Sequence, residues 1–227
     1  MKMFAKINWF YVVVVIFAGL LFKILFYRVL RRPLGSKLSA RFIGIFTGLK
    51  PKVIGALDPD AQMLIINHQS ELDIGILESA LDEDLVWVAK KELFEVPFFS
   101  LAVKVSEDIA LERNSKSALV SLLKQVKDRV EKGRIVCIFP EGTRSESGKM
   151  LPFKQGAKII ADKYALRVQP VVIVRSSHYF SNKTHTARAG KIKIVFLESF
   201  IADRSDKEWL KELRVKMQEA YDAHLKD

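Results

Sequence analysis

The segment SALVSLLKQVKDRVEKGRIVCIF, residues 117–139, contains a helix and a buried strand in one continuous unit. The apolar residues of its first part recur at helical spacing and predict one buried face: Leu119, Leu122, Leu123, Val126 and Val130. Gly133 then ends a helix predicted for Ser117–Lys132. Ile135–Phe139 follows as a continuous apolar run, which is typical of a strand buried on both faces of a parallel sheet.

The same alternation continues on both sides of this unit. Further strands are predicted at Met63–Asn67, Leu85–Ala89, Ile109–Glu112, Val168–Val174 and Ile192–Leu197. Further helices are predicted at Leu72–Leu81, at Gly156–Tyr164 and from Ser205 onward, where Glu208 completes a capping box. Strands that alternate with helices predict an α/β domain with a largely parallel sheet flanked by helices.

The positive charge is concentrated before this domain. The chain has 227 residues with 37 basic and 26 acidic side chains, yet ten of the basic ones and none of the acidic ones precede residue 53. Ile7–Phe22 is apolar except for Asn8, and Leu38–Leu49 has apolar residues at helical spacing. We expect residues 1–52 to be a hydrophobic and basic membrane-attachment segment, and residues 53–227 to be the folded domain.

The sequence leaves three arrangements of this segment open: a helix that spans the bilayer, a helix that lies in a single leaflet, or packing of Phe42–Leu49 on the folded domain. Because residues 53–227 are nearly neutral, the pattern does not favour a nucleic-acid-binding protein, which spreads basic side chains over its folded surface. Nucleic acid is therefore not an expected partner.

His68 and Asp73 follow the predicted strand Met63–Asn67. A neutral imidazole accepts a proton at neutral pH, and a nearby carboxylate fixes its tautomer. We therefore expect His68 to be a general base and Asp73 its orienting carboxylate. The same stretch has a structural interpretation, because Ser70 and Asp73 match a capping box for the next helix and would leave His68 as a loop residue.

A second polar segment follows the strand Ile135–Phe139, and the carboxyl ends of parallel strands meet at one edge of a sheet. There Gly142 permits close backbone approach, Arg144 offers a planar fork for phosphate, and Glu141 can accept a hydrogen bond from a substrate hydroxyl or hold a basic neighbour. The predicted substrate-binding residues are Arg113, Glu141, Gly142, Thr143, Arg144 and Lys154.

The sequence argues against other chemistries. The single cysteine, Cys137, lies inside an apolar strand and is expected to be a core residue. No Cys/His cluster has zinc-ligand spacing, and the Gly-x-Ser-x-Gly signature of serine hydrolases is missing. We expect neither a metal nor a cofactor.

Taken in order, these segments resemble the glycerolipid acyltransferase family, and within it the bacterial 1-acyl-sn-glycerol-3-phosphate acyltransferases. Residues 67–73, NHQSELD, look like the motif whose His and Asp form the catalytic pair. Residues 139–145, FPEGTRS, are similar to the motif that binds the phosphate and glycerol of the acceptor. Residues 109–114, IALERN, look like the motif whose arginine, here Arg113, contacts phosphate, although Glu107 and Ala110 depart from the family pattern.

The resemblance implies transfer of a fatty acyl group from acyl-CoA or acyl-carrier protein to the 2-hydroxyl of lysophosphatidic acid, forming phosphatidic acid in phospholipid biosynthesis. The implied partners are these substrates and anionic membrane lipid, at the cytoplasmic face of the inner membrane. Two alternatives stay open: an acyltransferase for another lysophospholipid or a lyso-aminolipid, and a non-catalytic lipid-binding protein.

Overall fold

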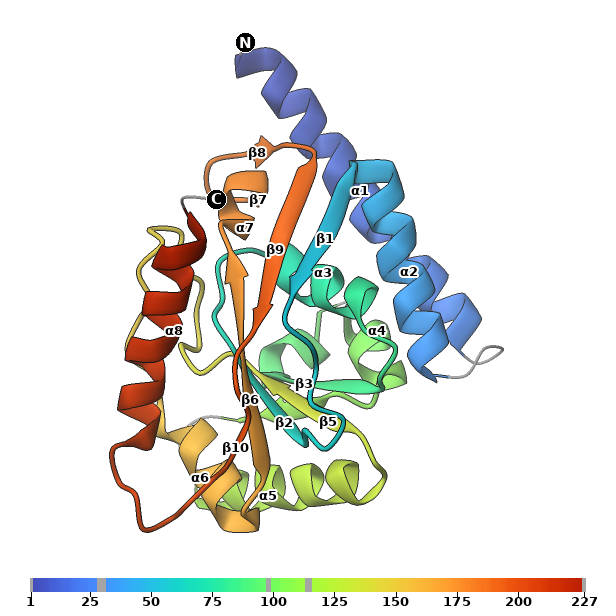
Figure 1. The fold of residues 1–227 in the computed structure, drawn as a ribbon. Helices are drawn as coiled ribbons and strands as arrows, with labels where there is room; N and C mark the ends of the chain where they lie inside the picture. The colour runs from blue at the N-terminus through green and yellow to red at the C-terminus, as the bar shows by residue number, and fades with distance from the viewer. Residues whose placement is uncertain (1, 28–31, 97–98, 113–115, 226–227) are drawn as a thin grey trace.

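The computed structural model describes residues 2–27, 32–96, 99–112 and 116–225, with the side chains of these ranges except those of residues 2–8, 26–27, 32–33, 99 and 116–117. Its centre is a sheet with helices on both faces (Figure 1). Along the sheet the strands are β1 (Leu49–Ile54), β9 (Gly190–Phe196), β6 (Arg167–Val174), β2 (Met63–Ile66), β5 (Ile135–Ile138), β3 (Leu85–Lys90) and β4 (Ile109–Leu111).

The pairings make the sheet largely parallel, as the alternating pattern predicts. β6 and β9 are antiparallel, and β10 (Phe200–Ile201) joins β6 in the same sense, while the other neighbouring strands run parallel. β2 and β5 are direct neighbours, with Leu64 opposite Cys137. Their carboxyl ends, where the two polar segments begin, therefore lie next to each other.

Alternate residues of the strands pack into two separate cores, as the two-residue period of a strand requires. Met63 and Ile65 face the core that is closed by α5 (Lys116–Glu131), α6 (Gln155–Tyr164) and α8 (Trp209–Leu225). Leu64 and Ile66 face the opposite core, which is closed by α3 (Leu72–Ala80) and by part of α1. Cys137 is fully buried in this second core, and its burial raises the pKa of the thiol, which agrees with its expected place in the core.

The N-terminal segment forms two helices, α1 (Lys2–Tyr27) and α2 (Arg32–Thr47), that lie side by side (Figure 1). α2 packs on α3. β1 follows α2 directly and adds an edge strand parallel to β9. The predicted division between residues 52 and 53 falls inside this strand. None of the described helices combines the length and apolar content that crossing a membrane requires.

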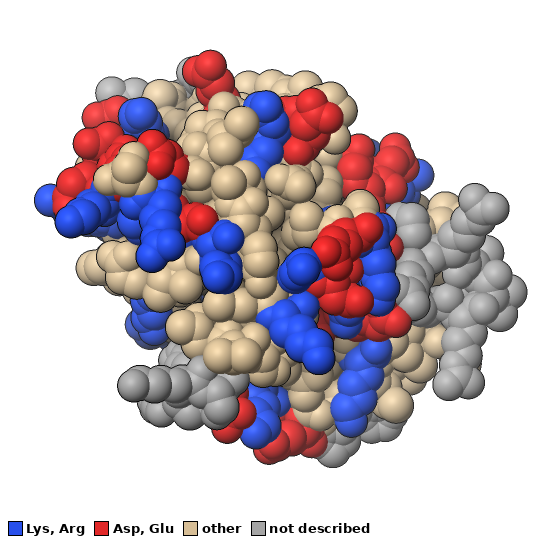
Figure 2. Space-filling view, turned by 90° about the horizontal axis from the view of Figure 1, so that it is seen from below, with Lys and Arg blue, Asp and Glu red and all other residues tan. Residues whose placement is uncertain are grey.

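The remaining described elements lie around the sheet. They are a 3₁₀ helix (η1, Lys91–Phe94), α4 (Phe99–Val105), α7 (Ser176–Tyr179) and a hairpin of β7 (Phe180–Ser181) with β8 (Thr186–Ala187). On the face shown in Figure 2, acidic and basic side chains are interspersed among uncharged ones.

The predicted start of the last helix at Ser205 is wrong. α8 begins at Trp209, and Asp206 Oδ1 accepts hydrogen bonds from the backbone N–H groups of Glu208 and Trp209 at 2.9 and 3.0 Å. Ser205 instead donates its hydroxyl to Asp203. A carboxylate at the start of a helix satisfies free N–H groups and interacts favourably with the helix dipole, so Asp206 outcompetes the serine three residues before Glu208.

Candidate active site

The structure brings His68 and Asp73 together at the carboxyl end of β2. Nδ1 of His68 lies 2.8 Å from Oδ2 of Asp73. The carboxylate is fully buried, whereas 18% of the imidazole remains exposed. Because Nδ1 is occupied by Asp73, Nε2 is the nitrogen left to face a substrate. This is the geometry that a general base and its orienting carboxylate require.

The loop between β2 and α3 is folded around the Asp73 carboxylate. Oδ2 also accepts the backbone N–H groups of Gln69 and Ser70, at 2.7 and 2.9 Å. Ser70 Oγ accepts the N–H of Leu72 at 3.2 Å and donates to the carbonyl of Phe180 at 2.7 Å. Only half of the predicted capping box is present, because Asp73 accepts the N–H of Ser70 but the Ser70 hydroxyl accepts the N–H of Leu72 and not that of Asp73. The base–carboxylate geometry is complete, and the contacts at the start of α3 hold Asp73 beside His68.

Glu141 connects this loop to the segment that follows β5. Its Oε1 accepts the backbone N–H of His68 at 2.9 Å, and its Oε2 accepts that of Leu151 at 2.8 Å. The side chain is almost completely buried, and this burial raises the pKa of the Glu141 carboxyl despite the two hydrogen bonds. Both carboxylate oxygens of Glu141 thus hold backbone N–H groups in place. A contact between Glu141 and the substrate stays a prediction.

The other predicted residues of this segment lie mostly at the surface. Gly142 has φ +67°, a left-handed conformation that glycine adopts without strain, and a Cβ there would lie 2.8 Å from Lys154 Nζ. Thr143, Arg144 and Lys154 are exposed. Lys154 Nζ therefore lies beside the backbone of Gly142, and Arg144 follows Gly142 by two residues. Phosphate binding by these two cations stays a prediction. Arg113 lies outside the described residues.

A second set of contacts around Arg144 was not predicted. Its guanidinium forms an ion pair with Glu71, which in turn accepts a hydrogen bond from Asn182 Nδ2 at 2.8 Å. Asn182 Oδ1 accepts the indole N–H of Trp9 at 3.1 Å, so these contacts extend to α1. Glu71 stands inside the NHQSELD segment, but nothing in a strand–loop pattern indicates that it faces the arginine of another loop.

An apolar cavity of about 520 Å³ opens beside this loop, between α1, α2 and α3. Leu72 and Glu71 belong to its wall, so it borders the segment that carries Asp73. The apolar side chains that α1 and α2 contribute are Trp9, Val13, Ile16, Phe17, Leu20, Ala40 and Ile43. Its size falls within the range of protein pockets that bind small organic ligands.

Comparison with known proteins identifies the family. Residues 56–174, which include both polar loops, match the model of the acyltransferase family. The chain belongs to the acyltransferase family. This acyltransferase is 40% identical over 218 residues to the 1-acyl-sn-glycerol-3-phosphate acyltransferase of Helicobacter pylori, a match that covers 94% of the chain and 92% of that protein.

Other relatives carry the same description. The 1-acyl-sn-glycerol-3-phosphate acyltransferase of Saccharomyces cerevisiae is 31% identical over 180 residues, and the match covers 77% of the chain and 59% of the yeast protein. The crystal structure of the 1-acyl-sn-glycerophosphate acyltransferase PlsC from Thermotoga maritima superposes with a TM-score of 0.78 at 20% identity, covering 98% of this chain and 97% of that one. The acyltransferase therefore shares the fold of PlsC from end to end.

Proposed function

We propose that this acyltransferase transfers a fatty acyl group from acyl-CoA or acyl-carrier protein to the 2-hydroxyl of 1-acyl-sn-glycerol-3-phosphate, forming phosphatidic acid. The observation that carries the proposal is the buried Asp73 carboxylate bound to Nδ1 of His68, next to a loop with an exposed arginine. The names of the relatives support the choice of acceptor.

In the proposed reaction, Nε2 of His68 removes the proton of the acceptor hydroxyl while that oxygen attacks the thioester carbonyl. The tetrahedral intermediate then collapses, the C–S bond breaks, and the imidazolium returns the proton to the leaving thiolate. Asp73 holds the imidazole and stabilises its protonated form. Arg144, with Lys154 and the undescribed Arg113, binds the acceptor phosphate so that the hydroxyl faces His68.

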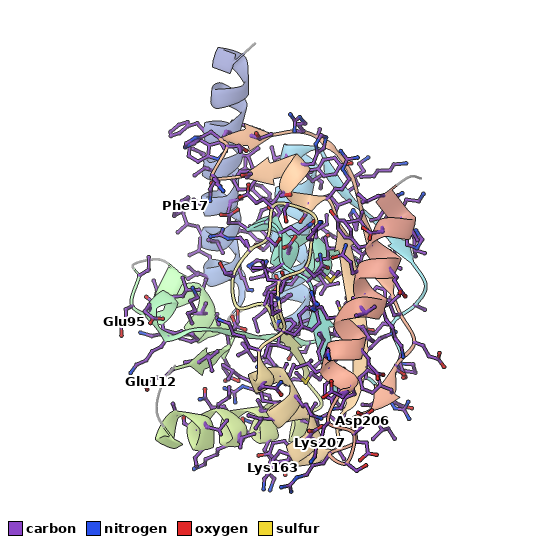
Figure 3. All side chains as sticks on the ribbon, turned by 90° about the vertical axis from the view of Figure 1, so that its left-hand side faces the viewer. Phe17, Glu95, Glu112, Lys163, Asp206 and Lys207 are labelled. Carbon is purple, nitrogen blue, oxygen red and sulfur yellow. The ribbon has the colours of Figure 1, made fainter. Side chains whose placement is uncertain are left out.

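We further propose that the N-terminal helices attach the enzyme to anionic lipid at the cytoplasmic face of the inner membrane. Exposed apolar residues recur every three or four positions along one side of α1: Phe10, Val14, Phe17, Leu21 and Leu25. We call this set the apolar stripe. Phe17 lies on the outer side of α1 (Figure 3). A continuous exposed apolar surface of this kind is typical of a helix that lies at a lipid interface.

The apolar cavity supports the same proposal. It borders the loop of His68 and Asp73 and extends between α1 and α2, the helices proposed to meet lipid. We propose that it receives an acyl chain, whose methylene groups match its mostly apolar wall.

The test measures thiol release by the purified full-length protein in anionic vesicles, with lysophosphatidic acid as acceptor and acyl-CoA and acyl-carrier protein as alternative donors. We expect release that depends on the acceptor and falls at least about 100-fold in His68→Ala, because general base catalysis is worth about that much or more. His178→Ala is the matched control, since His178 is exposed and lies outside both loops, and it should keep full activity.

Two outcomes would overturn the proposal. One is release that persists in His68→Ala. The other is equal release with lysophospholipids that lack a phosphate monoester, which would assign the enzyme to another acceptor class.

A further inference from the structure

The imidazole of His68 is covered on one face by the ring of Phe139, a residue with no predicted role. The two ring centroids lie 3.9 Å apart, and the ring planes differ by only 13°. Phe139 is the first residue after β5, and His68 is the second residue after β2. Because β2 and β5 are neighbouring parallel strands, their ends present the two rings side by side.

A third ring supports Phe139 from behind. Trp87 of β3 stacks on Phe139 with a centroid separation of 5.2 Å and an angle of 20°. β3 is the next strand after β5 in the sheet, and Trp87 pairs with Cys137. Phe139, two residues after Cys137, therefore points to the same face of the sheet as Trp87. Three neighbouring strands thus supply one continuous stack of rings that ends on His68.

Trp87 is itself tightly held. Only 3% of it is exposed. Its backbone N–H donates to Asp108 Oδ1 at 2.9 Å, and its indole N–H donates to Glu78 Oε1 at 3.2 Å. Glu78 also pairs with Lys23 of α1, with both side chains buried. The ring that supports Phe139 therefore has a fixed position and plane.

The hydrogen bond to Asp73 does not restrain the rotation of the His68 ring. A single bond to Nδ1 fixes the position of one ring atom but not the plane of the ring, and Nε2 moves when the ring turns about that contact. Packing against the face of Phe139 fixes this plane. The face of an aromatic ring also carries negative potential and attracts a cation, so the contact becomes more favourable when the imidazole is protonated.

We propose that Phe139, supported by Trp87, is a positioning residue for His68: it sets the plane of the imidazole and stabilises the imidazolium formed during acyl transfer. This inference rests on the proposed function. Among the described residues, the carboxylates hydrogen-bonded to His68 are Asp73, at Nδ1, and Glu141, whose Oε1 accepts the backbone N–H. Asp73 meets an edge of the ring, whereas Phe139 covers a face.

The test compares Phe139→Leu with Phe139→Tyr in full-length protein on the same vesicles. Leucine keeps an apolar side chain but removes the ring, and we expect kcat to fall by roughly 10- to 100-fold with little change in KM for lysophosphatidic acid. The acidic limb of the kcat/KM profile should move to lower pH by roughly half a unit, because the imidazolium loses its aromatic partner. Phe139→Tyr keeps the ring face and should restore both values.

A second experiment keeps the shape of the ring. Phenylalanines carrying one, two or three ring fluorines at position 139 weaken the negative potential of the ring face stepwise, and the acidic limb should shift stepwise with them. If the wild-type enzyme is active and Phe139→Leu has the same kcat and the same pH profile, the inference is wrong. The proposed function would still stand in that case. Loss of thermal stability without a change in either quantity would also overturn the inference. A wild-type enzyme that releases no thiol would overturn the proposed function, and this inference with it.

Discussion

At the scale of single residues, one carboxylate oxygen of Asp73 both contacts the proposed base and holds the loop around it. Oδ2 of Asp73 accepts hydrogen bonds from His68 Nδ1 and from the N–H groups of Gln69 and Ser70, while Oδ1 is buried without a hydrogen-bond partner among the described residues. The carboxylate that orients the proposed base therefore also shapes the loop that carries it.

Asp73→Asn should lower kcat by about 10³- to 10⁴-fold, because a neutral amide neither stabilises the imidazolium nor guarantees the correct tautomer. It should also lower the free energy of unfolding by about 1–3 kcal/mol, since an NH₂ group in place of Oδ1 would be buried without an acceptor. Thiol release and urea unfolding measure the two effects. Asp222→Asn, an exposed carboxylate on α8, should change neither. Retention of more than a tenth of kcat by Asp73→Asn would contradict the expectation.

The sequence predicted the roles of residues that lie close together in one segment, because their spacing can be read directly. His68 and Asp73 lie five residues apart after a buried strand, and the structure joins them. The contacts of Glu141 could not be predicted, because its partners are backbone N–H groups of residues 68 and 151. The ring of Phe139 meets His68 only through the order of the strands, which residue patterns do not specify.

At the scale of elements, the first residue of α8 depends on which side chain accepts the backbone N–H groups of the first turn. Asp206→Ala should lower the free energy of unfolding by about 1 kcal/mol, because it removes the acceptor for two backbone donors. Ser205→Ala should have a smaller effect, since that hydroxyl donates to Asp203 on the exposed surface and not to the helix backbone. Urea unfolding of the two variants at one pH gives the comparison. A larger loss in Ser205→Ala would restore the capping box expected from the sequence.

The sequence predicted the helices and strands that have long apolar patterns. The elements that it did not predict lack such a pattern for physical reasons. β1 contains Lys50-Pro51-Lys52, which interrupts any apolar alternation. Proline is accepted there because β1 is an edge strand with one unpaired side. The β7–β8 hairpin lies between β6 and β9, which are antiparallel. Strands as short as β7 and β8 leave little pattern in the sequence, so the direction of β9 could not be predicted.

At the scale of the whole molecule, one buried carboxyl makes stability depend on pH. Burial raises the pKa of Asp108 to about 7, although Lys23 and the N–H of Trp87 oppose the shift. Between about pH 4 and pH 7 the folded state therefore holds a proton that the unfolded state has released, so the free energy of unfolding falls as pH rises and levels off above pH 7.

Asp108→Asn tests this dependence, because asparagine keeps an acceptor for Trp87 without titrating. We expect the variant to be more stable than the wild type at pH 8, by on the order of 2–4 kcal/mol, and about equal to it at pH 4. Urea unfolding at the two pH values measures this difference. A difference that is the same at both would show that Asp108 does not titrate in this window.

The apolar stripe gives a second prediction for the whole molecule. Phe17→Glu with Leu21→Glu should reduce co-sedimentation with anionic vesicles at least about tenfold, because each side chain contributes about 1.5–3 kcal/mol when it leaves water. Val120→Glu is the control, since Val120 is exposed on α5, which lies away from α1 (Figure 1), and it should bind vesicles normally. Equal binding by all three proteins would remove the proposed attachment surface.

The buried ion pair between Lys23 and Glu78 has a geometric consequence for an enzyme that works on a bilayer. Lys23 stands on the buried side of α1, nearly opposite the apolar stripe, and its partner belongs to α3, the helix that follows His68. Rolling α1 about its own axis would separate the pair and leave the Glu78 carboxylate buried without its cation, which is strongly unfavourable. With the stripe in lipid as proposed, the ion pair therefore fixes which side of α1 meets the bilayer and keeps α3 on the side of α1 that faces away from it.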